Sequence, residues 1–187
     1  FCTYKNCLEF YKCIQPNFIK IAEDICGNHC LQCLISHQSS IEERNIIKSC
    51  VKDNLDYLCY NQKSSYVIHQ IIKSIKENDR EYLNNYILEN LVSLCLNTKG
   101  ICIVKEFINN MTRNFYIKHV LNTFEKNMKI LTFNQFGNFG VQEVIKVFGI
   151  NNCNKLIENI NRNFLEYSIS KYSSNVICFL LKTLKEH

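Results

Sequence analysis

The chain has 187 residues and a formal net charge of +5, and its composition excludes several classes of protein. A single proline and five glycines leave no linker-like stretch, so we expect one continuous domain with a substantial core. No apolar run approaches the ~20 residues that a membrane-spanning helix needs, and no secretory leader is evident. The first residue is Phe1 and not Met, which leaves room for an upstream segment.

The predicted elements begin with a short helix at 7–14 and then recur in a block that repeats five times. Each block opens with an asparagine, and successive asparagines lie 37, 36, 37 and 36 residues apart. A block of this length cannot enclose a core alone, so the copies should stack into a solenoid with a shared interior. The five positions are Asn17, Asn54, Asn90, Asn127 and Asn163.

Each block predicts two helices in succession. Apolar residues one and four positions after the asparagine mark one face of a first, short helix. A small polar residue then closes this helix or caps the next, at Asp24, Asn61, Asn97, Asn134 and Ser170. A second helix begins near Gly27, Ser64, Gly100, Gly137 and Ser173.

Third amphipathic stretches lie between the blocks, for instance at 40–51, 80–88 and 115–124. Nothing in the chain alternates as a strand does. The sequence therefore predicts an all-α protein with about three helices per repeat.

Twelve cysteines raise the question of disulfides or a metal. Four of them occupy places where the helical pattern calls for an apolar residue, and free cysteine behaves as a small buried hydrophobe. We therefore expect reduced core or groove thiols, an intracellular compartment, and neither metal nor cofactor. These four are Cys30, Cys33, Cys59 and Cys95. The best metal candidate lies on one predicted helix, which cannot wrap a tetrahedral ion with its own side chains: Cys26, Cys30, Cys33 and His37.

The second-helix blocks carry a family resemblance. GNHCLQCLI, FGNFGVQEVI and YSSNVICFLL resemble the RNA-reading helices of Pumilio/PUF repeats. QFGNFGVQEVI is close to that family's DQYGNYVVQ block and KYSSNVICFLL to its KFSSNVIEKCL block, whereas KSSYVIHQII and KGICIVKEFI align mainly by register. The resemblance runs from 17 to about 185. It implies a right-handed α-solenoid, a crescent of about five tandem three-helix repeats of 36–37 residues.

In domain terms the resemblance implies one Pumilio-homology-like domain over 1–187. Its repeats would be approximately 17–53, 54–89, 90–126, 127–162 and 163–187, with 1–16 as the remnant of a preceding repeat or cap. The family usually carries eight repeats, so this is either part of a longer protein or a reduced member.

The resemblance also implies how RNA would be read. One base per repeat is contacted on the concave face by two edge-contacting side chains and one stacking side chain. The edge pairs fall at Asn28/Gln32, Ser65/His69, Ile101/Lys105, Asn138/Gln142 and Ser174/Cys178. The stacking positions fall at His29, Tyr66, Cys102, Phe139 and Asn175.

These pairs predict unequal specificity. Asn with Gln, in the first and fourth repeats, is the family's uracil-reading combination, and Ser65/His69 matches no combination that we would assign. In the fifth repeat Cys178 stands where the family's guanine reader has Glu, and a thiol is a weak hydrogen-bond partner. In the third repeat Ile101 cannot hydrogen-bond a base edge and Lys105 suits a phosphate, so this part should tolerate any base or bind none.

The positive net charge suits a polyanion, with an affinity that falls as salt rises. Candidate phosphate contacts near the second helices are Lys63, Lys99, Lys105 and Lys171. An enzyme is not expected, because the histidines His29, His37, His69 and His119 have no accompanying nucleophile or carboxylate outside the repeat pattern.

Three functional classes remain open. The first is a single-stranded RNA-binding protein that regulates mRNA translation in the cytoplasm through 3′ UTR elements, with possible protein co-regulators. The second is a ribosome-biogenesis factor that binds pre-rRNA with little specificity in the nucleus or nucleolus. The third is a protein-binding helical scaffold. None of them requires a membrane or a small-molecule substrate.

Overall fold

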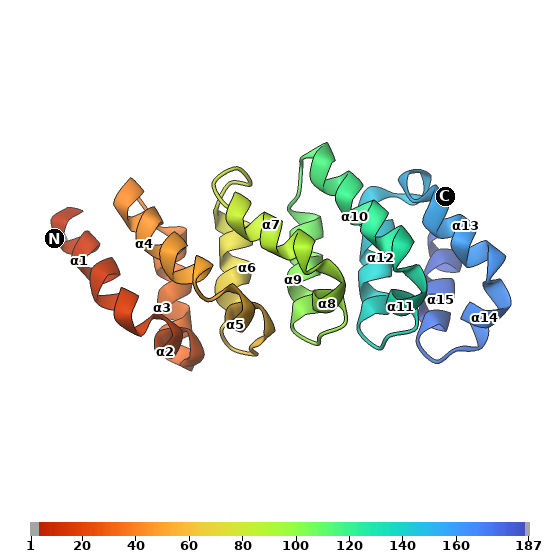
Figure 1. Cartoon of the computed structure of the whole chain (residues 1–187), viewed down its shortest axis with the longest axis horizontal. Helices are drawn as coiled ribbons and strands as arrows, with labels where there is room; N and C mark the ends of the chain where they lie inside the picture. Colours follow the sequence, from red (N-terminus) through yellow and green to blue (C-terminus); the bar gives the residue numbers. More distant parts are fainter. Residues whose placement is uncertain (1–3, 186–187) are drawn as a thin grey trace. The chain divides into compact units, whose positions relative to one another are not determined.

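Figure 1 shows the computed structural model, which describes residues 4–185, with side chains from residue 8 onward. Across those residues all regular structure is helical and no strand occurs, so the predicted all-α class is confirmed. Contacts group the chain into two compact units, 1–86 and 87–187, with the division inside helix α7 (Glu81–Glu89). Within the described part, no helix combines the length and apolar character that crossing a bilayer requires.

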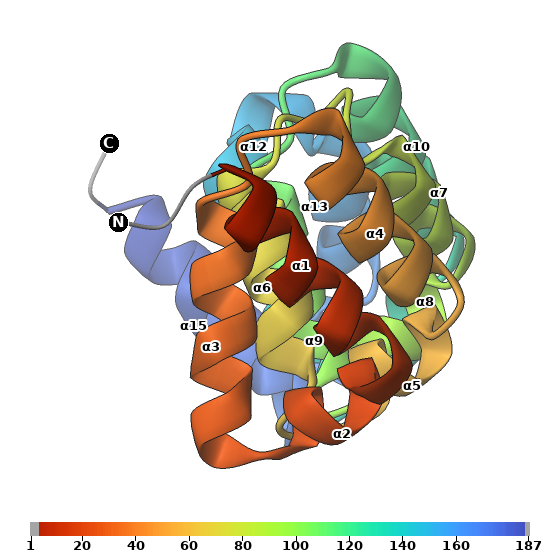
Figure 2. The same ribbon diagram turned by 90° about the vertical axis from the view of Figure 1, so that its left-hand side faces the viewer.

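The first unit contains two repeats and a preceding helix. Figure 2 shows α3 and α6 side by side on one face, with α1 and α4 packed on the other. The 7–14 helix predicted from sequence is the greater part of α1. The elements are α1 (Tyr4–Ile14), η1 (Gln15–Asn17), α2 (Phe18–Glu23), α3 (Ile25–Ser36), α4 (Ile41–Lys52), α5 (Leu55–Tyr60) and α6 (Ser65–Ser74).

The second unit continues the same order of short, second and third helices. Its second helices α9, α12 and α15 pack in sequence, α9 on α12 and α12 on α15. The elements are α8 (Leu91–Cys95), α9 (Gly100–Asn109), α10 (Asn114–Lys126), α11 (Met128–Thr132), α12 (Gly137–Phe148), η2 (Ile150–Asn152), α13 (Asn154–Arg162), α14 (Phe164–Ile169) and α15 (Ser173–Thr183).

The predicted polar junction residues cap the second helices in the first four repeats. The Asn97 side-chain oxygen accepts hydrogen bonds from the backbone N–H groups of Lys99 and Gly100, at 2.8 and 3.0 Å. Such side chains satisfy N–H groups that have no partner within the helix. Asp24, Asn61 and Asn134 accept equivalent bonds.

Two of the glycines that open second helices allow a close approach to the preceding short helix. A Cβ added at Gly100 or Gly137 would lie 2.5 Å from the backbone oxygen of Leu94 or Leu131 respectively. Any larger residue would force the two helices of the repeat apart.

Buried aliphatic and aromatic side chains from all three helices of a repeat form the core of each unit. Cys59 and Cys95 belong to this core, and burial raises the pKa of the Cys59 thiol to about 12. The expectation that Cys30 and Cys33 would also be buried is wrong, because both are exposed. Tyr11 of α1 reaches the backbone oxygen of Leu34 on α3, but among residues 8–185 no neighbour covers Cys30 or Cys33, whereas Val67, the residue equivalent to Cys30 in the second repeat, is fully buried.

Candidate nucleic-acid interface

The five second helices present their predicted reading positions with a common pattern of exposure. The first position is buried in the first four repeats and half-buried at Ser174. The second position is exposed in all five repeats, and the side chains of Tyr66 and Phe139 are 56% and 47% exposed. The third position is half-buried in four repeats and exposed at Cys178. This pattern follows from helix geometry, since residues i and i+4 share a face and i+1 points about 100° away.

In the first repeat the two amide side chains bond to one another. The Gln32 Nε2 donates to the Asn28 Oδ1 at 2.6 Å. The Asn28 Nδ2 donates in turn to the backbone oxygens of Ala22 and Lys63, both at 2.7 Å. The Asn28 side chain therefore makes three hydrogen bonds, and one of them fixes the position of the half-buried Gln32 amide.

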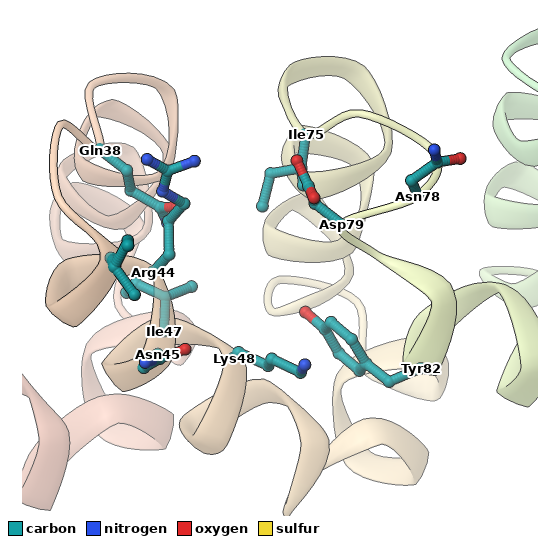
Figure 3. A pocket seen from close by; sticks show the side chains of 10 residues that line it. Gln38, Arg44, Asn45, Ile47, Lys48, Ile75, Asn78, Asp79 and Tyr82 are labelled. Carbon is teal, nitrogen blue, oxygen red and sulfur yellow. The ribbon is translucent and has the colours of Figure 1, made fainter.

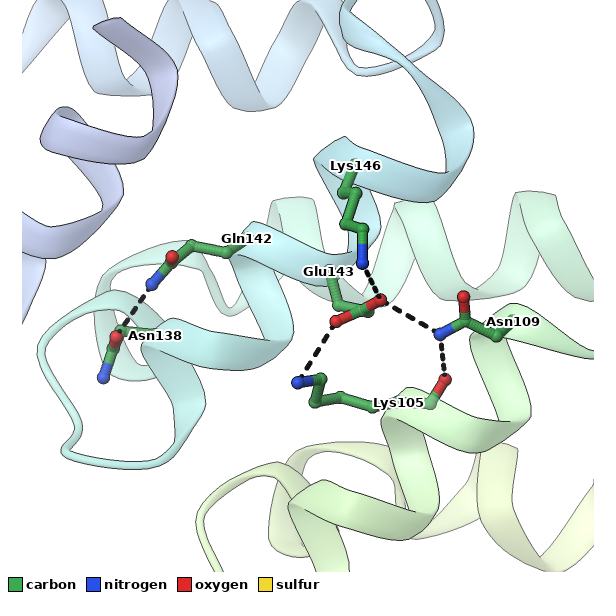
Figure 4. A network of polar contacts seen from close by, with 6 residues as sticks. All are labelled: Lys105, Asn109, Asn138, Gln142, Glu143 and Lys146. Atoms are coloured by element: carbon green, nitrogen blue, oxygen red, sulfur yellow. Dashed lines mark hydrogen bonds and ion pairs between the residues drawn. The ribbon is translucent and has the colours of Figure 1, made fainter. Parts of the chain in front are cut away.

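The fourth repeat has the same pair of bonded amides, but its asparagine is anchored to the backbone just before it. Gln142 Nε2 donates to Asn138 Oδ1 at 3.1 Å (Figure 4), and Asn138 Nδ2 donates to the backbone oxygens of Asn134 and Gln135 at 2.9 and 3.0 Å. In both repeats the buried asparagine serves as an anchor. The glutamine keeps its carbonyl oxygen and its second N–H outside these bonds, so it can offer one acceptor and one donor.

A cleft of about 400 Å³ lies between α3 and α6 in the first unit. The exposed side chains of His29 and Tyr66 both line it, and so does Gln32. Aromatic faces of this kind can hold a flat base by stacking. The remaining lining residues are Ile25, Asn28 and Lys63.

The second repeat has a serine and a histidine at its two edge positions. The Ser65 Oγ donates to the backbone oxygen of Gln62 at 3.2 Å and is buried. The rings of Tyr66 and His69 lie with their centroids 6.3 Å apart, inclined at 41°. Tyr66 is thus the most accessible of the three predicted positions in this repeat.

The third repeat has a different construction. Ile101 is only 5% exposed, and its Cδ1 lies 3.2 Å from where a Cβ on Gly140 would stand, so it packs against α12. The Lys105 Nζ lies 3.3 Å from the Glu143 Oε2. The other carboxylate oxygen of Glu143 accepts from Asn109 Nδ2 at 3.0 Å and meets Lys146 Nζ at 3.4 Å (Figure 4).

The ionic cluster on α9 and α12 has a buried carboxylate at its centre. Glu143 is 6% exposed. Its burial acts to raise the pKa of the carboxyl, but hydrogen bonds from Asn109 and Lys105 and the two lysine charges outweigh that effect and lower the pKa. Sequence reasoning missed Glu143 and Asn109, because the partners of Lys105 lie one helical turn or one whole repeat away and carry no motif.

The fifth repeat presents the weakest polar pair. The Ser174 Oγ donates to the backbone oxygen of Lys171 at 3.4 Å, and both Asn175 and Cys178 are exposed. Among the predicted phosphate contacts, Lys63 lines the α3–α6 cleft and is exposed, and Lys99 is half-buried at the N-cap of α9. The Nζ of Lys171 lies 5.3 Å from the centre of the Tyr172 ring.

A second cleft, of about 320 Å³, lies in the first unit away from the reading positions. Figure 3 shows Arg44, Lys48 and Tyr82 around it, with Lys48 Nζ 5.6 Å from the centre of the Tyr82 ring. Its lining comes from α4, α7 and the loops that follow α3 and α6, and it shares no residue with the α3–α6 cleft. The residues from 8 to 185 contain no cluster of three or more His, Cys, Asp or Glu side chains that could hold a metal ion.

Comparison with known proteins identifies the fold. No family model matches the sequence. An Arabidopsis thaliana protein named as a pumilio homolog (number 20) is 19% identical over 166 residues, which cover 89% of this chain and 48% of that protein. The chain thus spans about half the length of this relative.

Solved structures match more extensively. The Puf4 RNA-binding domain, bound to a recognition sequence from the HO endonuclease RNA 3′ UTR, aligns over 97% of this chain and 57% of its own with a TM-score of 0.90 at 22% identity. PUF-6 in complex with RNA aligns over 94% of this chain and 52% of its own, with a TM-score of 0.85 at 21% identity. The chain therefore has the helical repeat fold of the Pumilio/PUF domains, as its repeat blocks predicted.

Proposed function

We propose that this chain binds single-stranded RNA and reads about one base with each second helix, without catalysing a reaction. The exposed stacking position and the half-buried edge position recur at the same register in both units. The structural neighbours Puf4 and PUF-6 are seen with RNA bound. Fold and surface pattern together favour the RNA-binding class over the protein-binding scaffold.

The observation that carries this proposal is the anchored glutamine of the first and fourth repeats. Uracil offers an acceptor at O4 beside a donor at N3. Gln32 and Gln142 each retain one carbonyl oxygen and one N–H, which complement that edge. Because a buried asparagine fixes each amide, little side-chain freedom is lost when a base binds.

For the biological role we propose regulation of messenger RNA through 3′ UTR elements. Puf4 is bound to a 3′ UTR recognition sequence, which supports this target class. Such a role would place the protein in the cytoplasm, where protein co-regulators would join it. The chain spans about half of each relative.

A second candidate is a ribosome-biogenesis factor that binds pre-rRNA with little specificity. The packed Ile101 side chain favours it, because the third repeat lacks a pair of polar edge residues of the usual kind. The two candidates differ in sequence preference, so one binding experiment separates them.

That experiment is selection of the purified chain against a randomised single-stranded RNA pool at physiological salt. We expect enriched motifs with two uracils three positions apart, read by the fourth and first repeats. Binding without enrichment would contradict base readout and support the second candidate. No RNA binding at all would support the third class, a protein-binding scaffold.

A variant pair tests the fourth repeat directly. Changing Asn138→Ser together with Gln142→Glu should move the preference at one base from uracil to guanine, since a carboxylate accepts from guanine where the amide matched uracil. Gln142→Glu alone is the matched control, because it keeps the Asn138 anchor. If both variants bind all RNAs alike, the assignment of this repeat is wrong.

A further inference from the structure

The cluster around Glu143 holds Lys105, the edge-position residue of the third repeat, in a defined place. Lys105 stands on α9 at the register that Gln142 occupies on α12, so it lies on the base-edge side of its helix. Its ammonium is 3.3 Å from the Glu143 carboxylate, and its side chain is 42% exposed. The lysine is thus held in place and still reaches solvent.

We propose that Lys105, positioned by Glu143, makes the third repeat select keto bases (uracil and guanine) over amino bases (cytosine and adenine). This inference rests on the proposed RNA-binding function and deepens it. An ammonium group has three N–H donors and no acceptor. Glu143 takes one of them, and two remain for the oxygen at uracil C4 or guanine C6.

An amino group at the same position of a base meets only donors. Cytosine and adenine carry –NH₂ where uracil and guanine carry oxygen. Ile101 cannot supply the missing acceptor, because its side chain is apolar and packs against α12. The donor of Lys105 is therefore opposed by a donor of an amino base, and discrimination follows from that mismatch.

The same cluster argues against a phosphate as the partner of Lys105. A phosphate within reach of its Nζ would also approach the Glu143 carboxylate, which carries the same sign of charge. An uncharged base edge meets no such repulsion. Burial and a hydrogen bond also restrict the Glu143 side chain, which is 6% exposed and accepts from Asn109.

The test uses the whole chain and a set of short RNAs. Each RNA carries uracil at the base that the fourth repeat should read. The next base on its 3′ side, which the third repeat should read, is varied over all four bases. Two matched comparisons isolate the contact: uracil against cytosine, and guanine against adenine. We expect roughly tenfold tighter binding of the keto base in each pair.

Variants separate the roles of the two residues. Lys105→Arg should keep the keto preference, and Lys105→Met should bring both ratios to about one. Glu143→Gln should also flatten the ratios, with overall affinity kept or raised, because the released lysine can then reach a phosphate. A purely structural role for Glu143 would lower binding to all four RNAs equally.

The outcomes also distinguish this inference from the proposed function. Equal binding of the four bases at the third repeat, with uracil still selected at the fourth, would overturn the inference alone. A preference for adenine or cytosine would do the same. Loss of selectivity at the fourth repeat as well, or no RNA binding, would contradict the proposed function and this inference with it.

Discussion

Helices α12 and α9 are neighbours in the second unit, yet they hold their edge-position side chains in different ways. On α12, Asn138 is anchored to the backbone of its own repeat and fixes Gln142 one turn later. On α9, Lys105 is fixed by Glu143, which belongs to the next repeat. The first arrangement is local and the second joins two repeats.

This difference affects how each site could change without loss of the fold. Because every contact of the α12 pair lies within nine residues, the pair can be kept or altered as one block. The α9 site depends on a buried carboxylate contributed by α12. A substitution in one repeat would therefore alter the chemistry of its neighbour.

The largest expected effect is at the local anchor. Asn138→Ala would remove a fully buried side chain, its two hydrogen bonds to the backbone oxygens of Asn134 and Gln135, and the acceptor for Gln142, and should lower the free energy of unfolding by about 2–3 kcal/mol. Ser174→Ala, at the equivalent half-buried position of the fifth repeat, is the matched control and should change it by about 0.5 kcal/mol or less. Urea unfolding measures both. If both variants lose the same free energy of unfolding, the Asn138 side chain does not anchor its repeat.

The next effect is at the joint between repeats. Glu143→Gln keeps an acceptor for Asn109 but removes the charge that Lys105 and Lys146 face, and should lower the free energy of unfolding by about 1–2 kcal/mol at pH 7. Lys146→Met is the control. Its side chain is 65% exposed, so its pair with Glu143 should contribute about 0.5 kcal/mol or less.

The difference between wild type and Glu143→Gln should also depend on pH. Because the folded-state pKa of Glu143 is lowered, the ionised form stabilises the fold above the ordinary carboxyl pKa of about 4.3. That contribution is lost as pH falls from this value through the lower, folded pKa. Unfolding curves for the two proteins should therefore converge below about pH 4. A constant difference down to pH 3 would contradict the role of the charge.

The sequence was sufficient for features that recur with the repeat. Asn97 and Asn134 could be recognised as caps because the same polar residue type returns every 36–37 residues, and their side chains do cap the second helices. Cys59 and Cys95 were correctly placed in the core for the same reason. Repetition supplies an internal comparison that a single sequence otherwise lacks.

The sequence could not predict which side chains of neighbouring repeats would contact one another. Lys105 and Asn109 lie one repeat before Glu143 in the sequence, so nothing in the pattern indicated that Glu143 would be buried against α9. Cys30 was assigned to the core because its position is apolar in the pattern, but burial there depends on a neighbouring second helix. Only three-dimensional packing shows which side of α3 is covered.

The smallest predicted effect tests the stacking positions of the same two helices. Phe139 on α12 and Cys102 on α9 are both exposed, so replacing either should leave stability nearly unchanged. Phe139→Ala should weaken RNA binding by about 1–2 kcal/mol, since an aromatic face is lost, and Cys102→Tyr should strengthen it by about 1 kcal/mol. Titration of a fluorescent RNA with each variant measures both changes.

Neither stacking variant should alter which base is preferred, because every base has a flat face and only the edge positions distinguish one base from another. If Cys102→Tyr tightens binding while the keto preference at the third repeat is retained, a base does lie over α9 and Lys105 reads its edge. If Cys102→Tyr has no effect while Phe139→Ala weakens binding, the RNA passes α9 without stacking. The two helices would then differ in whether they bind a base at all, and not only in how their edge-position side chains are held.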